Sequence, residues 1–377
     1  MNHRALFIFG TRPEAIKVAP VVRAFAEAGF SARVCSTGQH RGMLDQVLEF
    51  FELKPDIDLA LMQPDQAPAA FAARAIEGCA RAIADEKPDL VLVQGDTTTA
   101  FAGAFAGAFA GFQARVPVAH IEAGLRSFRK DAPFPEEMNR MLVGDLADLH
   151  FAPLDGARAN LEREGIRDGV HVVGNTVVDA LLLGLNLIQQ RGDGGFRAQF
   201  PMIGAGPLVL VTLHRRESFG APLAEICAAL RTLAEEDPAR QFIYPVHLNP
   251  RVRETVFGTL GGMANVHLIE PLGYPDFLWL MSQAQLILTD SGGVQEEAPS
   301  LGVPVLVARE VTERQEGVEA GCARLVGSNR ELILREARIA LAGGWPALAR
   351  KTNPYGDGHA SRRIAEISAA FLASRSA

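Results

Sequence analysis

Short apolar runs alternate with longer amphipathic segments along the whole chain. The runs are continuously apolar and rich in β-branched residues, as in ALFIFGT at 5–11. The segments between them repeat apolar residues at helical spacing, as from Pro13 to about Ala28. Such alternation predicts parallel sheets whose two faces are both covered by helices. We expect strands within 5–11, 31–37, 89–96, 116–124, 150–154, 170–174, 207–215, 241–247, 266–271, 286–293, 303–309 and 323–327.

The chain is long for a single hydrophobic core. Its 377 residues favour two domains. The strand and helix rhythm starts again after the polar, glycine-rich stretch at 189–207, and the segment GNTVVDALLLG lies just before it. We therefore predict an α/β protein with two Rossmann-like, doubly wound domains that face each other across a cleft. The boundary is expected between residues 1–174 and 175–358.

Composition and charge narrow the class of protein. Hydrophobic residues make up 48% and charged residues 21% of the chain, as in ordinary globular proteins. The formal charge of −7 disfavours nucleic acid or an anionic membrane as a partner. The first apolar run, Ala5 to Phe9, is too short for a signal peptide or a membrane span.

Cysteine and histidine spacing gives no sign of a disulfide framework or a metal site. The cysteines are scattered and no CxxC pair occurs, which is typical of reduced thiols in a cytosolic protein. No HExxH motif or Cys/His cluster is present, so we expect neither a metal nor another cofactor. The four cysteines are Cys35, Cys79, Cys227 and Cys322.

One local repeat, AFAG, occurs three times in a row at 100–111. Its phenylalanines recur every four residues and form one helix face, whereas its glycines line another face and could allow close packing. The simplest interpretation is a helix that lies on the first sheet. The residues concerned are Phe101, Phe105, Phe109, Gly103, Gly107 and Gly111.

Polar residues gather after the predicted strands, which is where parallel sheets bind ligands. Any one of them has a plain structural explanation, since a His at a strand end is more often scaffold than catalyst. Together they are sorted, with carboxylates in the first half and His and Arg in the second. We expect both groups to line one cleft. They include Gly10, Arg12, Lys17, Asp96, Glu122, Glu136, Glu137 and Arg140, then His214, Arg215, Arg216, His247, Arg309 and Arg314.

The stretch LTDSGGVQEEAPSLG at 288–302 reads as a strand, a glycine turn and a helix. A turn at Ser291, Gly292 and Gly293 would hold phosphate through backbone N–H groups and the helix dipole. Glu297 lies about one helical turn further on, where it can accept hydrogen bonds from a ribose. Because no P-loop lysine follows, the pattern favours a nucleotide diphosphate bound through N–H groups, Arg and His, such as a nucleotide sugar.

Ten segments, taken in order from Phe9 to Gly358, together resemble the non-hydrolysing UDP-N-acetylglucosamine 2-epimerase family. Single segments such as GDT mean little, but the set is specific. The segments are FGTRPEAIKVAPVV, QHRGMLDQVL, GDTTTA, HIEAGLRS, PFPEEMNR, HRRES, PVHLNP, TDSGGVQEEAPSLGVPVL, TERQEGVEAG and NPYGDG.

The resemblance implies a GT-B-like fold in which a C-terminal helix, here within 359–377, joins the first domain. It also implies a cytosolic homodimer that interconverts UDP-N-acetylglucosamine and UDP-N-acetylmannosamine for surface polysaccharide synthesis. The acid/base positions of the family match Asp96, Glu122, Glu136 and His214. Its substrate-binding positions match Arg12, Lys17, Arg140, Ser291, Gly292, Glu297 and Arg314, and Phe277 matches a position beside the uracil. We count Gly293 and His247 among the substrate-binding candidates as well.

The implied chemistry explains why carboxylates are needed. The proton on C2 of the sugar is not adjacent to a carbonyl, so direct abstraction is difficult. If UDP leaves first, C1 becomes oxocarbenium-like and a carboxylate can remove the C2 proton, which leaves 2-acetamidoglucal and UDP. Reprotonation on the other face and return of UDP give the epimer. The residues do not tell which carboxylate serves which face.

The sequence departs from the family pattern at two places. Gln94 stands where several relatives carry His, and we expect this exchange to alter a hydrogen bond to Asp96. Gly42 follows QHR where some bacterial relatives carry Gln or Glu. In such relatives this region contacts a second, activating UDP-N-acetylglucosamine, and Gln39, His40 and Arg215 are the candidates for that site here.

Three other functions fit parts of the pattern. A sister epimerase acting on a modified UDP-sugar, such as a diacetamido uronic acid, would need few changes. A GT-B glycosyltransferase would share the fold and the phosphate turn, but it would need an acceptor site. A nucleotide-sugar binding protein without catalytic activity would not need acid/base groups on both sides of the sugar.

Overall fold

The computed structural model describes residues 3–38, 41–63, 66–110, 115–215, 218–345 and 353–376. It divides into two compact units, the first comprising Met1–Leu183 and Gly356–Ala377 and the second Gly184–Tyr355. The division therefore falls within a helix, some nine residues after the boundary expected from the sequence.

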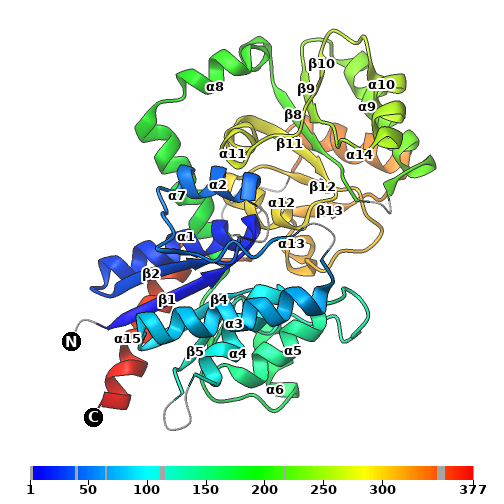
Figure 1. Ribbon diagram of the computed structural model, residues 1–377. Coiled ribbons are helices and arrows are strands. Elements are labelled where there is room, and N and C mark those ends of the chain that lie inside the picture. The colour runs from blue at the N-terminus through cyan, green and yellow to red at the C-terminus, as the bar shows by residue number, and fades with distance from the viewer. Residues whose placement is uncertain are drawn as a thin grey trace. The chain divides into compact units, whose positions relative to one another are not determined.

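The first unit is built on a parallel sheet of seven strands in the order β3-β2-β1-β4-β5-β6-β7 (Figure 1). Its central strands are continuously apolar and buried, which is what helices on both faces of a parallel sheet require. The strands are β1 (Arg4–Phe9), β2 (Ser31–Ser36), β3 (Ile57–Asp58), β4 (Leu90–Gln94), β5 (Val118–Ile121), β6 (Leu149–Ala152) and β7 (Val170–Val172).

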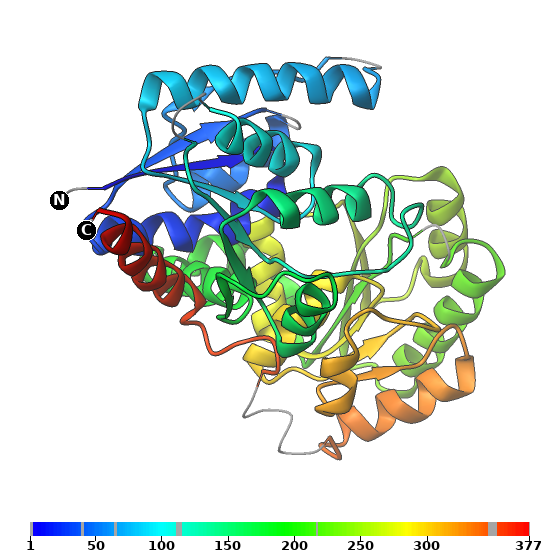
Figure 2. The same cartoon turned by 90° about the horizontal axis from the view of Figure 1, so that it is seen from below.

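Helices cover both faces of this sheet. On one face α3 packs against α4, which also contacts α5, and on the other face α1 contacts both α2 and α15 (Figures 1 and 2). The helices are α1 (Arg12–Glu27), α2 (Arg41–Phe50), α3 (Pro68–Glu86), α4 (Thr98–Ala108), α5 (Glu136–Leu146), α6 (Asp155–Arg163), α7 (Thr176–Arg191) and α15 (Ala360–Ser376).

The C-terminal helix α15 is held to the first unit at its N-terminus. The Asp179 carboxylate accepts hydrogen bonds from the Ser361 N–H at 2.8 Å and the Ala360 N–H at 3.3 Å. These are two of the N–H groups that a helix start leaves without an intrahelical partner. Arg363 adds a hydrogen bond to the Val173 carbonyl at 3.1 Å.

The AFAG helix α4 packs on the sheet through its small residues. A Cβ at Gly103 would lie 2.9 Å from Val93 Cγ1, and one at Gly107 would lie 2.7 Å from Val118 Cγ2. The close packing expected of the glycines therefore occurs. The phenylalanines point elsewhere, and Phe109 is 66% exposed while its ring stacks on that of Phe105. Gly111 lies outside the described residues.

The second unit repeats the architecture with a parallel sheet of six strands in the order β10-β9-β8-β11-β12-β13. Helices α9, α10 and α14 pack on one face, and α11 packs on β8 and β11 (Figure 1). The strands are β8 (Leu208–Thr212), β9 (Gln241–Pro245), β10 (Val266–Ile269), β11 (Ala284–Thr289), β12 (Val305–Val307) and β13 (Ala323–Leu325). The helices are α8 (Gly194–Gln199), α9 (Ala221–Glu236), α10 (Pro250–Leu260), α11 (Tyr274–Gln283), α12 (Gly292–Glu297), α13 (Gln315–Glu319) and α14 (Arg330–Leu341), with 3-10 turns η1 (Pro201–Ala205) and η3 (Ala298–Leu301).

The predicted fold class of two Rossmann-like parallel-sheet units is confirmed, and every strand expected from the sequence is present. The short strand β3 was not expected. In both sheets the strand order reverses once, between β1 and β4 in the first unit and between β8 and β11 in the second. Such reversal points are where open α/β sheets bind ligands, outside the carboxyl ends of the strands.

Within the described ranges, no helix is long and apolar enough to cross a membrane. The same part of the chain contains no cluster of three or more His, Cys, Asp or Glu side chains that could hold a metal ion. The four cysteines are buried. Burial raises the pKa of the Cys35 thiol to about 12, so this thiol stays protonated at neutral pH.

Candidate active site

The turn after β1 is built around the buried carboxylate of Glu14. It accepts hydrogen bonds from the N–H groups of Gly10 at 3.0 Å and Thr11 at 2.8 Å, in a capping box at the start of α1. It also accepts one from the Thr97 hydroxyl at 2.6 Å, which ties this turn to the turn after β4. A Cβ at Gly10 would lie only 2.2 Å from Thr37 Oγ1, so a larger residue would displace the turn.

Glu122 is the most strongly bound of the candidate carboxylates. Lys17 Nζ lies 2.6 and 2.7 Å from its two oxygens, and the Gln94 amide donates to one of them. From the sequence we expected the Gln94 side chain to affect a hydrogen bond to Asp96. In the structure its amide donates to Glu122 instead. Glu122 has a φ of 68°, a left-handed conformation that costs a non-glycine residue about 1–2 kcal/mol and often marks a functional site.

Asp96, directly after β4 and Gly95, pairs with Arg140 of α5. Arg140 Nε donates to Asp96 Oδ2 at 2.9 Å, and the terminal nitrogen of the guanidinium lies 2.6 Å from the same oxygen. The Asn139 amide donates to the Asp96 carbonyl at 2.9 Å. The start of α5 thus fixes both the backbone and the side chain of Asp96.

Glu137 holds the Arg140 side chain that pairs with Asp96. Its carboxylate accepts from the N–H groups of Ser127 and Phe128 and pairs with Arg140 at 3.1 Å. Burial raises the pKa of Glu137, but these hydrogen bonds outweigh burial and the net pKa is lowered. The Arg140 pKa is raised overall, because the attraction of Asp96 and Glu137 outweighs desolvation. Glu137 and Arg140 are therefore both charged at neutral pH.

Two other candidates of the first unit have unengaged side chains. Among the described residues, the Glu136 carboxylate and the Arg12 guanidinium make neither an ion pair nor a side-chain hydrogen bond. Both are half-buried and stand at helix starts, Glu136 on α5 and Arg12 on α1. Since neither is committed to the scaffold, both can interact with a ligand.

His120 on β5 is a supporting residue. Its Nε2 lies 2.7 Å from the Gly95 carbonyl, and it therefore holds the turn that carries Asp96. Desolvation by burial lowers the His120 pKa to about 3, despite this hydrogen bond. The imidazole is neutral at physiological pH, so Nε2 is the N–H that donates to the carbonyl.

In the second unit, His214 follows β8 and is held by Asp290, the first residue after β11. Its Nδ1 lies 3.0 Å from Asp290 Oδ1, and its backbone N–H donates to the same carboxylate at 3.0 Å. Burial raises the Asp290 pKa, but the hydrogen bonds from His214 and Arg215 outweigh it and lower the net pKa. The His214 side chain is 48% exposed, so its other ring nitrogen is accessible.

The glycine turn after β11 lies under Arg314. A Cβ at Gly292 would meet the guanidinium carbon of Arg314 at 2.9 Å, whereas one at Gly293 would meet no atom closer than 4.0 Å. Arg314 Nε donates to Glu296 Oε1 at 2.9 Å, and this hydrogen bond fixes the position of the guanidinium next to the turn. Ser291 is the N-cap of α12, a helix of only six residues that continues as the 3-10 turn η3.

The remaining substrate-binding candidates surround this turn. Glu297 is buried and accepts a hydrogen bond from the Tyr274 hydroxyl at 3.3 Å. Burial and the neighbouring Glu297 raise the Tyr274 pKa well above its ordinary value, so this hydroxyl remains a donor. Phe277 is half-buried on α11, three residues after Tyr274. His247 is exposed after β9, with its Nδ1 accepting from the Asn249 N–H at 3.1 Å.

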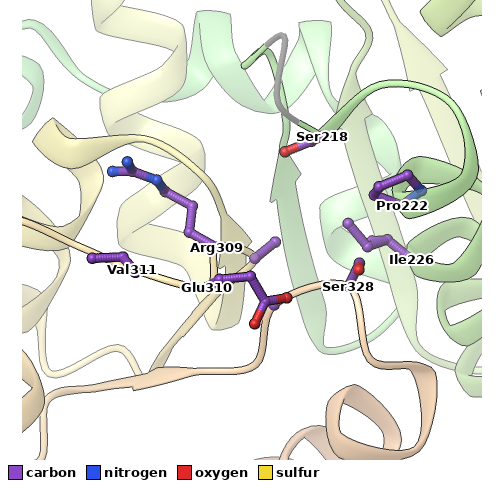
Figure 3. Close-up of a pocket in the computed structure, with 9 residues that line it drawn as sticks. Ser218, Pro222, Ile226, Arg309, Glu310, Val311 and Ser328 are labelled. Carbon is purple, nitrogen blue, oxygen red and sulfur yellow. The ribbon is translucent and has the colours of Figure 1, made fainter. Parts of the chain in front are cut away.

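A cavity of about 310 Å³ opens in the second unit at the carboxyl ends of β8, β12 and β13 (Figure 3). Ser218, Pro222 and Ile226 line one wall and the segment 308–311 lines the other, with Ser328 between them. The Ser218 hydroxyl donates to Asp290 at 3.4 Å, which connects this cavity to the His214 pair.

Of the three candidates for an allosteric site, only Arg215 belongs to the described residues. Gln39 and His40 lie outside the described residues. Arg215 contributes its backbone N–H to Asp290 at 2.9 Å, and its side-chain Nε is buried without a hydrogen bond to any described residue.

The structure thus pairs several of the sequence candidates after the strands of each sheet. In the first unit Lys17 contacts Glu122 and Arg140 contacts Asp96. In the second unit His214 contacts Asp290, and Arg314 lies close to Gly292. Sequence reasoning missed the supporting residues. Glu14 could have been found from the capping-box spacing T-x-x-E, and Asp290 from its position at a strand end. Tyr355 lies in the segment NPYGDG, and its hydroxyl accepts from the Gly317 N–H at 3.0 Å and donates to the Arg314 carbonyl.

Comparison with known proteins identifies relatives over nearly the whole chain. The family model UDP-N-acetylglucosamine 2-epimerase matches residues 23–369. The UDP-N-acetylglucosamine 2-epimerase of Escherichia coli (strain K12) is 50% identical over 370 residues, which cover 96% of this chain and 97% of that protein.

Solved structures agree with this relationship. The UDP-GlcNAc 2-epimerase from Neisseria meningitidis, solved bound to UDP-GlcNAc, is 43% identical with a TM-score of 0.85, covering 97% of this chain and 100% of that one. A UDP-N-acetylglucosamine 2-epimerase from Listeria monocytogenes, described as putative, is also 43% identical and has a TM-score of 0.90, covering 99% and 98%. Family model, sequence relatives and fold all agree, and this chain belongs to the UDP-N-acetylglucosamine 2-epimerase family.

Proposed function

We propose that this chain interconverts UDP-N-acetylglucosamine and UDP-N-acetylmannosamine by elimination and re-addition of UDP. The observation that carries the proposal is the pairing of charged groups at the carboxyl ends of both sheets, in a chain that belongs to this family. Relatives bind UDP-GlcNAc, as the Neisseria meningitidis structure does by its description. The two groups of residues act on one UDP-sugar, the carboxylates on the sugar ring and the second-unit residues on UDP.

In the first step the bond between C1 and the UDP oxygen breaks. Arg314, His214 and the N–H groups of the Ser291–Gly293 turn stabilise the negative charge that develops on the diphosphate. The sugar becomes oxocarbenium-like at C1, and the carboxylates of the first unit stabilise this positive charge. Because UDP stays bound, the step is reversible and no sugar is released.

In the second step a carboxylate removes the C2 proton as the C1–C2 double bond forms. The products are 2-acetamidoglucal, a protonated carboxyl group and the UDP anion, so atoms and charges balance. Return of a proton to the opposite face of C2, together with attack of UDP on C1, gives the epimer. Asp96, Glu122 and Glu136 are the candidates for the two faces, and the assignment among them stays open.

The surroundings of the carboxylates support these roles. Lys17 and Gln94 hold Glu122, and Arg140 holds Asp96, so both carboxylates are oriented before the reaction begins. Such fixed pairs cost little reorganisation in the transition state. The Glu136 carboxylate makes no ion pair or side-chain hydrogen bond to the described residues, so it can bind the substrate directly.

The proposal is tested by incubating the protein with UDP-N-acetylglucosamine in D2O and following the reaction by NMR. We expect deuterium at C2 and a UDP-N-acetylmannosamine signal without added cofactor. Absence of exchange would refute the proposal, as would release of free N-acetylmannosamine as the main product. Exchange only with a diacetamido uronic acid analogue would identify a sister epimerase, and transfer to an acceptor a glycosyltransferase. The homodimer and the cytosolic location stay predictions from the resemblance.

A further inference from the structure

The Asp290 carboxylate has no role in the mechanism above, yet it is among the most completely engaged groups of the second unit. The residue is fully buried. It accepts hydrogen bonds from the His214 N–H at 3.0 Å, the Arg215 N–H at 2.9 Å and the Ser218 hydroxyl at 3.4 Å. All these donors come from the single turn that follows β8.

The fourth contact of Asp290 involves the imidazole itself. His214 Nδ1 lies 3.0 Å from Asp290 Oδ1. An ionised carboxylate only accepts hydrogen bonds, so Nδ1 must carry the hydrogen. In the neutral ring Nε2 is then the basic nitrogen, and it belongs to a side chain that is 48% exposed.

We propose that Asp290 is the positioning residue for His214, which it holds in the Nδ1–H tautomer with Nε2 presented to the departing UDP. One carboxylate grips both the backbone N–H and the ring of His214, so neither can rotate without breaking a contact to a buried charge. Nε2 takes up a proton from solvent before UDP departs, the same carboxylate stabilises the resulting imidazolium, and the Nε2–H then donates to the diphosphate. The inference deepens the proposed function, since it rests on a catalytic role for His214.

The first test needs no variant. Imidazole 15N shifts of the full-length protein, with His214 assigned by its loss in His214→Gln, report which ring nitrogen carries the hydrogen. We expect the Nδ1–H tautomer at neutral pH. An Nε2–H tautomer, or a mixture of the two such as a free imidazole gives, would overturn the inference.

The second test asks whether Asp290 acts through His214. Asp290→Asn keeps the size of the side chain, but it replaces one of two hydrogen-bond-accepting oxygens with an NH2 group, which can only donate. His214 is then no longer held in one tautomer, so we expect kcat to fall on the order of 100-fold with little change in KM. The double variant Asp290→Asn/His214→Gln should be no slower than His214→Gln alone. Independent, multiplying losses would show that Asp290 only supports the fold.

Controls separate the possible failures. Asp237→Asn changes a partly exposed carboxylate of the same unit, paired with Arg240 at 3.1 Å, and should leave kcat unchanged. Should Asp290→Asn not fold, Ser218→Ala removes the longest of the hydrogen bonds to Asp290 and should lower kcat only a few-fold. A Ser218→Ala enzyme with a changed His214 tautomer would contradict the account.

Absence of C2 exchange in the wild type would refute the proposed function. The imidazole 15N shifts, in contrast, test the contact between Asp290 and His214 independently of activity.

Discussion

In both units each proposed functional side chain is paired with a side chain of opposite charge, but the sign of the functional group differs between the units. In the first unit the proposed reacting groups are carboxylates, and cations of the scaffold hold them: Lys17 holds Glu122, and Arg140 holds Asp96. In the second unit the proposed ligand-binding groups are His214 and Arg314, and buried carboxylates hold them.

The supporting carboxylates of the second unit are Asp290 and Glu296, which are 0% and 4% exposed. A buried charge without a partner is costly, so each functional group and its support must be present together. The comparison teaches that one type of scaffold can orient a functional group of either charge by pairing it with a side chain of the opposite charge.

The largest effect is expected at the carboxylates of the first unit. Asp96→Asn removes the negative charge while the amide oxygen can still accept from Arg140, so the fold should persist. We expect kcat for epimerisation to fall by about 10²–10⁴-fold. UDP affinity, measured by calorimetry, should stay within about two-fold, because a change of about 0.4 kcal/mol or less is expected for a group that does not touch UDP.

Asp148→Asn is the matched control for Asp96→Asn. Asp148 also pairs with an arginine, Arg115, and accepts the Val118 N–H at 3.0 Å, but it stands at the opposite edge of the sheet, just before β6. Its replacement should leave kcat unchanged. A loss of UDP affinity in Asp96→Asn as large as its loss of kcat would contradict the proposal that the first unit acts on the sugar and the second unit binds UDP.

The second prediction concerns the glycine turn. The Cβ introduced by Gly292→Ala would lie 2.9 Å from the Arg314 guanidinium and must displace it, whereas Gly293→Ala meets nothing closer than 4.0 Å. We expect UDP affinity to fall about 100-fold for Gly292→Ala, or about 2.7 kcal/mol, and clearly less for Gly293→Ala. Equal losses in the two variants would show that Arg314 is not placed by this contact.

The third prediction uses pH to distinguish the units. His150 on β6, register neighbour of His120, is buried, and desolvation lowers its pKa to about 4. The unfolded chain binds a proton to this ring below about pH 6.5, whereas the folded chain does not until about pH 4, so stability is lost as pH falls between these values.

In His150→Gln the free energy of unfolding should therefore fall about 2 kcal/mol less between pH 7 and pH 5 than in the wild type, as measured by urea unfolding. His267→Gln is the comparison in the second unit, because that ring is only partly buried and its pKa is lowered less by desolvation. A pH slope in His150→Gln equal to that of the wild type would contradict the buried, neutral imidazole.

The smallest effect is expected at Gln94. Gln94→Ala removes one donor to Glu122 while Lys17 keeps both of its contacts, so we expect kcat to fall about tenfold, or about 1.4 kcal/mol. Gln94→His, which places an imidazole donor at this position, should restore part of the rate. A full loss of activity in Gln94→Ala, as large as in Asp96→Asn, would mean that the amide does more than orient Glu122.

Much of this arrangement could be predicted from the sequence, because strand ends are visible in it. Continuous apolar runs located the strands, and polar residues that followed them fell at the edge where ligands bind. Asp96, His214 and Ser291 could be found in this way. The glycine pattern of α4 likewise predicted close packing on the sheet.

The partners of these residues could not be predicted, because they come from segments far apart in the chain. Nothing near Gln94 in the sequence indicates that its side chain turns to Glu122 and not to Asp96. Asp290 has no role in the sequence prediction, and only the contact between the ends of β8 and β11 shows that it binds His214. The end of α12 at Glu297, by contrast, is visible in the sequence, because Pro299 has no N–H to continue the helix.

A crystal structure of Asp96→Asn with UDP-N-acetylglucosamine bound tests the central claim most directly. The account predicts UDP on the Ser291–Gly293 turn beneath Arg314, with C2 of the sugar within about 3.5 Å of Glu122, Glu136 or the side chain at position 96, the distance that proton transfer requires. A UDP-sugar bound on that turn with its ring away from every one of these carboxylates would contradict it.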